Sequence, residues 1–145
     1  MGCDIHVCVE VKTKGKWILI NSPMIRRNYD LFAKMANVRN DYGIVPISKP
    51  KGLPENISDG TKLYLNIWDG DGHSYSWFTP KEMGVLQEHI DGLDSDDRWS
   101  INHIHNHVEK EFGYLFGDSI DGFIKYPEDQ PEWLEDVRVI FWFDN

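Results

Sequence analysis

Polar and aliphatic side chains alternate along the first strand-like segment, residues 3–11, CDIHVCVEV. Successive side chains of an extended strand point to opposite faces, so one face is expected to carry Asp4, His6, Cys8 and Glu10. A carboxylate, an imidazole and a thiol side by side can ligate a metal or transfer protons. The same alternation also fits a sheet with one solvated face, and both interpretations stay open at this point.

A comparable polar face is expected near the other end of the chain. The strand-like segment 137–143, VRVIFWF, places Arg138 and Trp142 at alternate positions, and this face continues to Asp144. Two strands with such faces could together build one site.

His73 is a further candidate ligand, because it follows the strand-like segment 62–68 and lies near Asp69 and Asp71. The run begins like a calcium-binding loop, but it lacks the glycine and the glutamate that such a loop needs at its sixth and twelfth positions. A divalent metal here would support a metal-dependent hydrolase such as a phosphodiesterase, with Asp69 or Asp71 assisting. The candidate ligands are Asp4, His6, His73 and Asp144.

Arginine is concentrated in one stretch of the chain, where three of the five arginines lie between residues 26 and 39. Two of them directly precede a helix expected over residues 29–38, and helix N-termini attract anions. The alternative is that these arginines are surface charges and that Arg39 lies past the helix end. The candidate residues for a small anionic or nucleotide-like ligand are Arg26, Arg27, Asn28 and Arg39, with Trp68, Trp77 and Trp142 as stacking surfaces.

Histidines cluster in a second stretch, residues 102–107, NHIHNH. His103 and His107 have the i, i+4 spacing that can share a metal. On the amphipathic helix expected over residues 101–115 they point away from the apolar side, which favours solvated side chains.

Strands and helices must be interspersed to position these residues. A turn at residues 13–16 predicts an early hairpin, and residues 62–68 and 137–143 predict two further strands. Helices are expected over residues 29–38, 80–90 and 101–115, and a long loop over residues 41–60. The pattern predicts an α+β fold in one domain, residues 1–145, with a single mixed or mainly antiparallel sheet covered by about three helices.

Composition limits the classes of function. The 145 residues carry a net charge of −9, with 41% hydrophobic and 13% aromatic residues. Such a chain can bury a core, and its acidity disfavours binding to long nucleic acid but leaves room for one small anion. An acidic run, residues 91–97, suggests an inhibitor of a host protein as a further alternative.

Location is also constrained by the sequence. Cys3 and Cys8 are expected on opposite faces of one strand, where they cannot form a disulfide, and this fits a reducing compartment. No apolar run approaches the roughly 20 residues of a membrane span, and the first residues lack the pattern of a signal peptide. We therefore expect a cytoplasmic protein without a membrane partner, and a homo-oligomer is compatible with the sequence.

Several short motifs occur together: MGCDIH at residues 1–6, RNYDLF at 27–32, HSYSW at 73–77 and FWFDN at 141–145. In this combination the chain resembles a family of small proteins encoded by bacteriophages and prophages. The family has no settled biochemical function, so the resemblance transfers no catalytic residue. It implies a protein made in the bacterial cytoplasm that binds or disables host factors, including nucleotide signals of defence systems. The leading hypothesis is therefore a binding protein for a small anionic or nucleotide-like ligand, and the sequence leaves open whether the protein is an enzyme.

Overall fold

The computed structural model describes residues 2–22, 24–25, 27–67, 70–91 and 132–145. These residues form four strands and three helices: β1 (Asp4–Thr13), β2 (Lys16–Asn21), α1 (Tyr29–Ala36), α2 (Asp59–Ile67), β3 (His73–Phe78), α3 (Pro80–Asp91) and β4 (Asp136–Asp144). The chain divides into two compact units. The first contains Met1–Arg27, Pro50–Thr79 and Pro131–Asn145, and the second contains Asn28–Lys49 and Pro80–Gln130.

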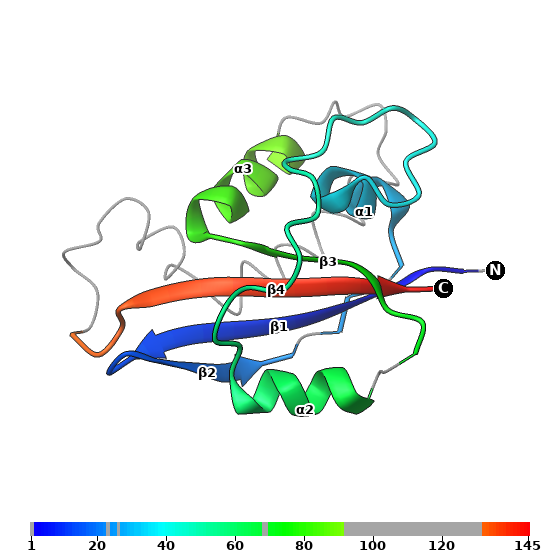
Figure 1. Cartoon of the computed structure of the whole chain (residues 1–145). Coiled ribbons are helices and arrows are strands. Elements are labelled where there is room, and N and C mark those ends of the chain that lie inside the picture. The colour runs from blue at the N-terminus through cyan, green and yellow to red at the C-terminus, as the bar shows by residue number, and fades with distance from the viewer. Residues whose placement is uncertain (1, 23, 26, 68–69, 92–131) are drawn as a thin grey trace. The chain divides into compact units, whose positions relative to one another are not determined.

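The four strands form one antiparallel sheet in the order β2-β1-β4-β3 (Figure 1). This confirms the predicted α+β fold with an early hairpin. The hairpin turn has positive φ angles at both central residues, 49° at Lys14 and 73° at Gly15. Two such residues match the right-handed twist of the flanking strands, so the chain reverses within two residues.

Strands β1 and β4 are the centre of the sheet and bring the two ends of the chain together. Their register runs from Asp4 opposite Asp144 to Lys12 opposite Asp136. Residues directly opposite each other in antiparallel strands point to the same face. The two polar faces that the sequence predicts are therefore a single face of the sheet.

That face is not solvated, so the solvated-face interpretation is wrong for most of β1. His6 is only 9% exposed, and Cys8 and Glu10 are fully buried. Helix α2 and the segment before it pack on this face, where Ile57, Tyr64 and Leu65 surround Cys8, Ile140 and Trp142. The valines and phenylalanines of the opposite face are buried as well, so both sides of β1 and β4 contribute to the core.

The strand predicted over residues 62–68 is wrong for residues 62–67, which belong to α2, and α2 runs beside β2 (Figure 1). Alternating Leu63, Leu65 and Ile67 suggested a period of two, but Leu63 and Ile67 are exposed. The side chains turned to the sheet are Thr61, Tyr64 and Leu65, at helical spacing. Ser58 starts the helix, since its hydroxyl accepts a hydrogen bond from the Thr61 N–H at 3.1 Å.

The other predicted elements within the described residues are close to the observed ones. Helix α1 begins as expected but ends two residues early, because Asn37 caps it in a left-handed conformation. Helix α3 begins at Pro80 as predicted. Strand β3 is new, since its residues were assigned no strand. The predicted helix over residues 101–115 lies outside the described residues. None of the described helices has the length and apolar composition that a membrane crossing requires.

Candidate functional site

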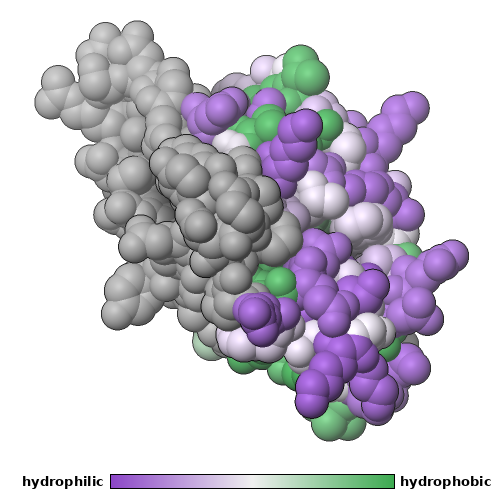
Figure 2. All heavy atoms as spheres, turned by 90° about the vertical axis from the view of Figure 1, so that its left-hand side faces the viewer, coloured by the Kyte–Doolittle hydropathy of each residue, from purple (hydrophilic) through white to green (hydrophobic). Residues whose placement is uncertain are grey.

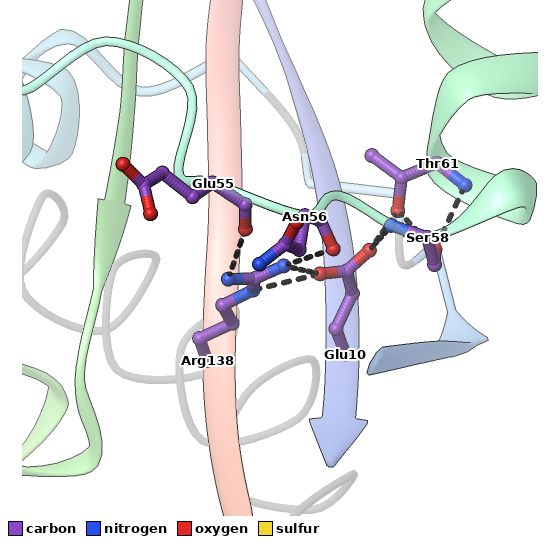
Figure 3. A network of polar contacts seen from close by, with 6 residues as sticks. All are labelled: Glu10, Glu55, Asn56, Ser58, Thr61 and Arg138. Atoms are coloured by element: carbon purple, nitrogen blue, oxygen red, sulfur yellow. Dashed lines mark hydrogen bonds and ion pairs between the residues drawn. The ribbon is translucent and has the colours of Figure 1, made fainter. Parts of the chain in front are cut away.

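A buried ion pair joins β1 and β4 on the α2 side of the sheet (Figure 3). Arg138 Nε donates to Glu10 Oε1 at 2.7 Å, and the two residues lie directly opposite each other in the register. The other carboxylate oxygen of Glu10 accepts from the Ser58 N–H at 2.8 Å and from the Thr61 hydroxyl at 2.7 Å. Glu10, Ser58, Thr61 and Arg138 are called the Glu10 cluster below.

Arg138 also fixes the loop that leads into α2. Its two terminal nitrogens donate to the carbonyl oxygens of Glu55, at 3.0 Å, and Asn56, at 3.1 Å. Its guanidinium carbon lies 3.8 Å from the centre of the Trp17 ring. Every charged atom of this buried pair thus has a partner, as a stable ion pair inside a protein requires.

The ionisable groups of this region are held in defined states. Burial acts to raise the pKa of Glu10, but hydrogen bonds from Ser58, Thr61 and Arg138 outweigh it and lower the pKa below its ordinary value of 4.5. Burial raises the pKa of the neighbouring Cys8 thiol to about 11. Glu10 is thus held as a carboxylate and Cys8 as a thiol, which makes Cys8 a poor nucleophile at neutral pH.

A second polar group lies four residues away along β1. His6 Nε2 lies 2.7 Å from Asp144 Oδ2, and because a carboxylate accepts, the imidazole is the donor. The His6 ring stacks on Trp142, and the Tyr75 ring stacks on Trp142 as well, with centroid distances of 5.5 and 6.0 Å. Tyr64 of α2 meets Trp142 edge-on at 5.8 Å. These five residues, His6, Tyr64, Tyr75, Trp142 and Asp144, are called the His6 cluster below.

Trp142 is fully buried between these rings, so it offers no open face to a ligand, contrary to the prediction. Its indole N–H has no hydrogen-bond acceptor among the residues that the structure describes. Tyr75 reaches Trp142 through an irregularity of β3, where Ser74 and Tyr75 together oppose one residue of β4. Such a bulge redirects a side chain.

The predicted metal ligands do not gather around one point. His73 lies opposite Phe143, and the two rings stack at 6.2 Å on the face of the sheet away from Trp142 and Asp144. Asp4 pairs with Arg27, whose Nε and Nη2 donate to the two carboxylate oxygens at 3.0 and 3.1 Å. Within the described part of the chain, no group of three or more His, Cys, Asp and Glu side chains is arranged to hold a metal.

The predicted arginine site is not assembled within either unit. Arg27 belongs to the first unit and already contacts Asp4. Arg39 belongs to the second, where it lies past the end of α1 with its guanidinium carbon 5.7 Å from the Tyr29 ring. Asn28 caps α1, since its side-chain oxygen accepts from the Leu31 N–H at 3.2 Å.

The remaining predicted residues have mixed outcomes. Trp77 is half-buried in β3, with the Lys51 ammonium 4.1 Å from its ring centre. Arg26, Trp68 and Asp69 lie outside the described residues, as do the histidine tract 102–107 and the acidic residues 92–97.

A groove of about 710 Å³ opens between the β1–β2 hairpin and the start of α2. Its cationic side chains are Lys12, Lys16 and Lys62, and Asp59 is its acidic one, which leaves a local excess of positive charge. It is called the hairpin groove below, and its lining residues are Lys12, Gly15, Lys16, Trp17, Ile18, Leu19, Asn56, Ile57, Ser58, Asp59, Gly60 and Lys62.

Helix α2 approaches β2 closely at Gly60, which lines the groove. A Cβ at this position would lie 2.9 Å from Leu19 Cβ, so only glycine lets α2 approach β2 this closely. On the face of the molecule toward which the hairpin turn points, the described side chains are mostly hydrophilic (Figure 2). An anion that approaches the turn meets the exposed Lys14 and Lys16 there.

Sequence reasoning missed the hairpin groove, because its lysines lie on three elements, β1, β2 and α2. Lys62 follows Lys16 by 46 residues, and its segment was assigned as a strand. The Glu10 cluster was predicted in part, because alternation places Glu10 and Arg138 on the polar faces of their strands. Only the antiparallel register of β1 and β4 shows that they meet.

Comparison with known proteins assigns the chain to no family, because no protein-family model, no curated protein and no solved structure matches it. The functional conclusion therefore depends on the contacts and charges of the described residues.

Proposed function

We propose that this protein binds a small anionic ligand and that the ligand lies in the hairpin groove. The observation that carries the proposal is the local charge: three lysines and one aspartate line this groove, in a chain whose net charge is −9. The volume of about 710 Å³ is within the range of small-molecule sites. Lysines that converge on a groove raise the local concentration of an anion and hold it.

The walls of the groove are well suited to binding because they are already ordered. Residues 55–58 are held by Glu10 and Arg138 from beneath. A ligand would therefore not need to order this segment, so binding would cost less conformational entropy than binding to a flexible loop.

The resemblance to phage-encoded proteins adds a setting to this proposal. The ligand would be a small anion of the bacterial cytoplasm, and holding it would counter a host defence that uses it as a signal. The metal-dependent alternative has no assembled ligand set within the described residues.

Calorimetry of the full chain with inorganic phosphate and with ribose 5-phosphate tests the proposal. We expect saturable binding of ribose 5-phosphate that weakens with added salt. The double variant Lys16→Ala/Lys62→Ala should lower the affinity by about tenfold or more, because charge-assisted hydrogen bonds are among the strongest polar contacts.

A matched control removes the same charge elsewhere. Lys49→Ala/Lys81→Ala changes two exposed lysines of the second unit and should bind like the unchanged protein. Absence of binding to either anion contradicts the proposal, and so does an equal loss in the two double variants. A loss confined to Arg27→Ala would move the ligand to the arginines that the sequence predicted.

A further inference from the structure

The hairpin groove has an aromatic wall as well as lysines. Trp17 lines the groove from β2, beside Leu19, and Ile57 lines it from the segment before α2. A bare phosphate ion would use only the cationic residues. Apolar and aromatic lining beside fixed charges is typical of sites for larger organic ligands.

The Trp17 ring is held in place from one side. The Arg138 guanidinium lies over it at 3.8 Å, and Arg138 is only 5% exposed. Arg138 is itself fixed by Glu10, Glu55 and Asn56. Lys12 Nζ, from β1, lies 5.9 Å from the centre of the same ring. Trp17 is half-buried and lines the groove, whereas Arg138 does not, so part of the Trp17 surface is accessible there. The stacking surface is therefore ordered before any ligand arrives.

Asn56 adds a polar side chain that can form hydrogen bonds with the edge of a heteroaromatic ring. It is exposed and lines the groove, while its backbone carbonyl accepts from Arg138 Nη2 at 3.1 Å. A carboxamide offers both a donor and an acceptor, which is the combination that heteroaromatic bases present on their edges.

We propose that the anion bound in the hairpin groove is a nucleotide, with its base stacked on Trp17 and its phosphate at Lys16 and Lys62. This inference rests on the proposed function and specifies its ligand class. The flat base would stack on the aromatic ring of Trp17, and the phosphate would form ion pairs with the lysines. Stacking of a base on an aromatic side chain tolerates different bases, so Asn56 would supply what selectivity there is.

The test compares three ligands by calorimetry on the full chain: adenosine 5′-monophosphate, ribose 5-phosphate and adenosine. We expect the nucleotide to bind about tenfold or more tightly than the sugar phosphate, in line with the usual contribution of one stacked base. Trp17→Leu should remove this advantage and leave the affinity for ribose 5-phosphate unchanged. Trp17→Phe should keep part of it, because a smaller ring still stacks.

The outcomes separate this inference from the proposed function. Equal affinities for the nucleotide and the sugar phosphate overturn the nucleotide assignment and leave anion binding intact. Absence of binding to all three ligands overturns both. The comparison of ligands on the unchanged protein decides the question even if Trp17→Leu fails to fold. Trp133→Leu, which changes a tryptophan that is 58% exposed and does not line the groove, is the control and should keep the full nucleotide advantage.

Discussion

The Glu10 cluster and the His6 cluster lie on the same face of the same two strands, yet they differ in how completely their polar atoms are bonded. The side chains of Glu10 and Arg138 are 0% and 6% exposed, and partners surround both. The side chains of His6 and Asp144 are 9% and 27% exposed. The Trp142 N–H between the rings has no acceptor among the described residues.

The difference follows from register and from what covers each cluster. Glu10 lies directly opposite Arg138, and the start of α2 supplies a backbone N–H and a hydroxyl above them. His6 lies opposite Trp142 and reaches Asp144 diagonally, while α2 supplies the ring of Tyr64. A buried ion pair needs hydrogen-bond partners from the element that covers it. We therefore assign to the Glu10 cluster a structural role, which is to hold residues 55–58 beside the hairpin groove.

The largest expected effect is the loss of the Glu10 charge. Glu10→Gln leaves the Arg138 guanidinium buried without a counter-charge, and we expect the free energy of unfolding to fall by about 3–5 kcal/mol. Urea denaturation followed by circular dichroism measures this loss. Glu135→Gln is the control, because Glu135 is exposed and accepts from the Gly15 N–H at 3.1 Å, so its replacement should cost less than about 1 kcal/mol. Similar losses of unfolding free energy in Glu10→Gln and Glu135→Gln would contradict the assignment, because the buried carboxylate would then stabilise the fold no more than the exposed one.

Acid should act on the Glu10 cluster in a defined pH range. The pKa of Glu10 is lowered in the folded protein, so its contribution to stability is complete above the unfolded value of about 4.5. It is lost as the pH falls through the lower, folded pKa. The stability gap between the unchanged protein and Glu10→Gln should therefore be constant from pH 8 to about 5.5 and shrink below about 4.5. Denaturation curves across this range measure the gap, and a gap that widens on acidification would contradict the assignment.

A smaller effect is expected at the His6 cluster. Asp144→Asn removes the charge but keeps an acceptor for His6, and water can reach this position, so we expect a loss of about 0.5–1.5 kcal/mol. The same denaturation measurement applies. Asp4→Asn breaks the exposed pair with Arg27 next to it and should cost less than about 1 kcal/mol. A loss in Asp144→Asn as large as that in Glu10→Gln would remove the distinction between the two clusters.

Local patterns predicted the elements whose side chains alternate or are capped in an ordinary way. Alternation located β1 and β4, the Lys14–Gly15 turn located the hairpin, and the signals at Pro80 located α3. The same reasoning failed for α2, because three exposed or half-buried apolar residues at odd positions imitate a strand.

The sequence by itself determined the fold class, the negative net charge and the presence of polar residues at alternate positions of β1 and β4. Only the tertiary structure decided which of these residues meet. Register joins Glu10 to Arg138 and separates His73 from His6, and the packing of α2 on β2 brings Lys62 to the same groove as Lys12 and Lys16. The physical reason is that periodicity fixes the face on which a side chain lies, whereas pairing and burial depend on elements that are distant in the chain.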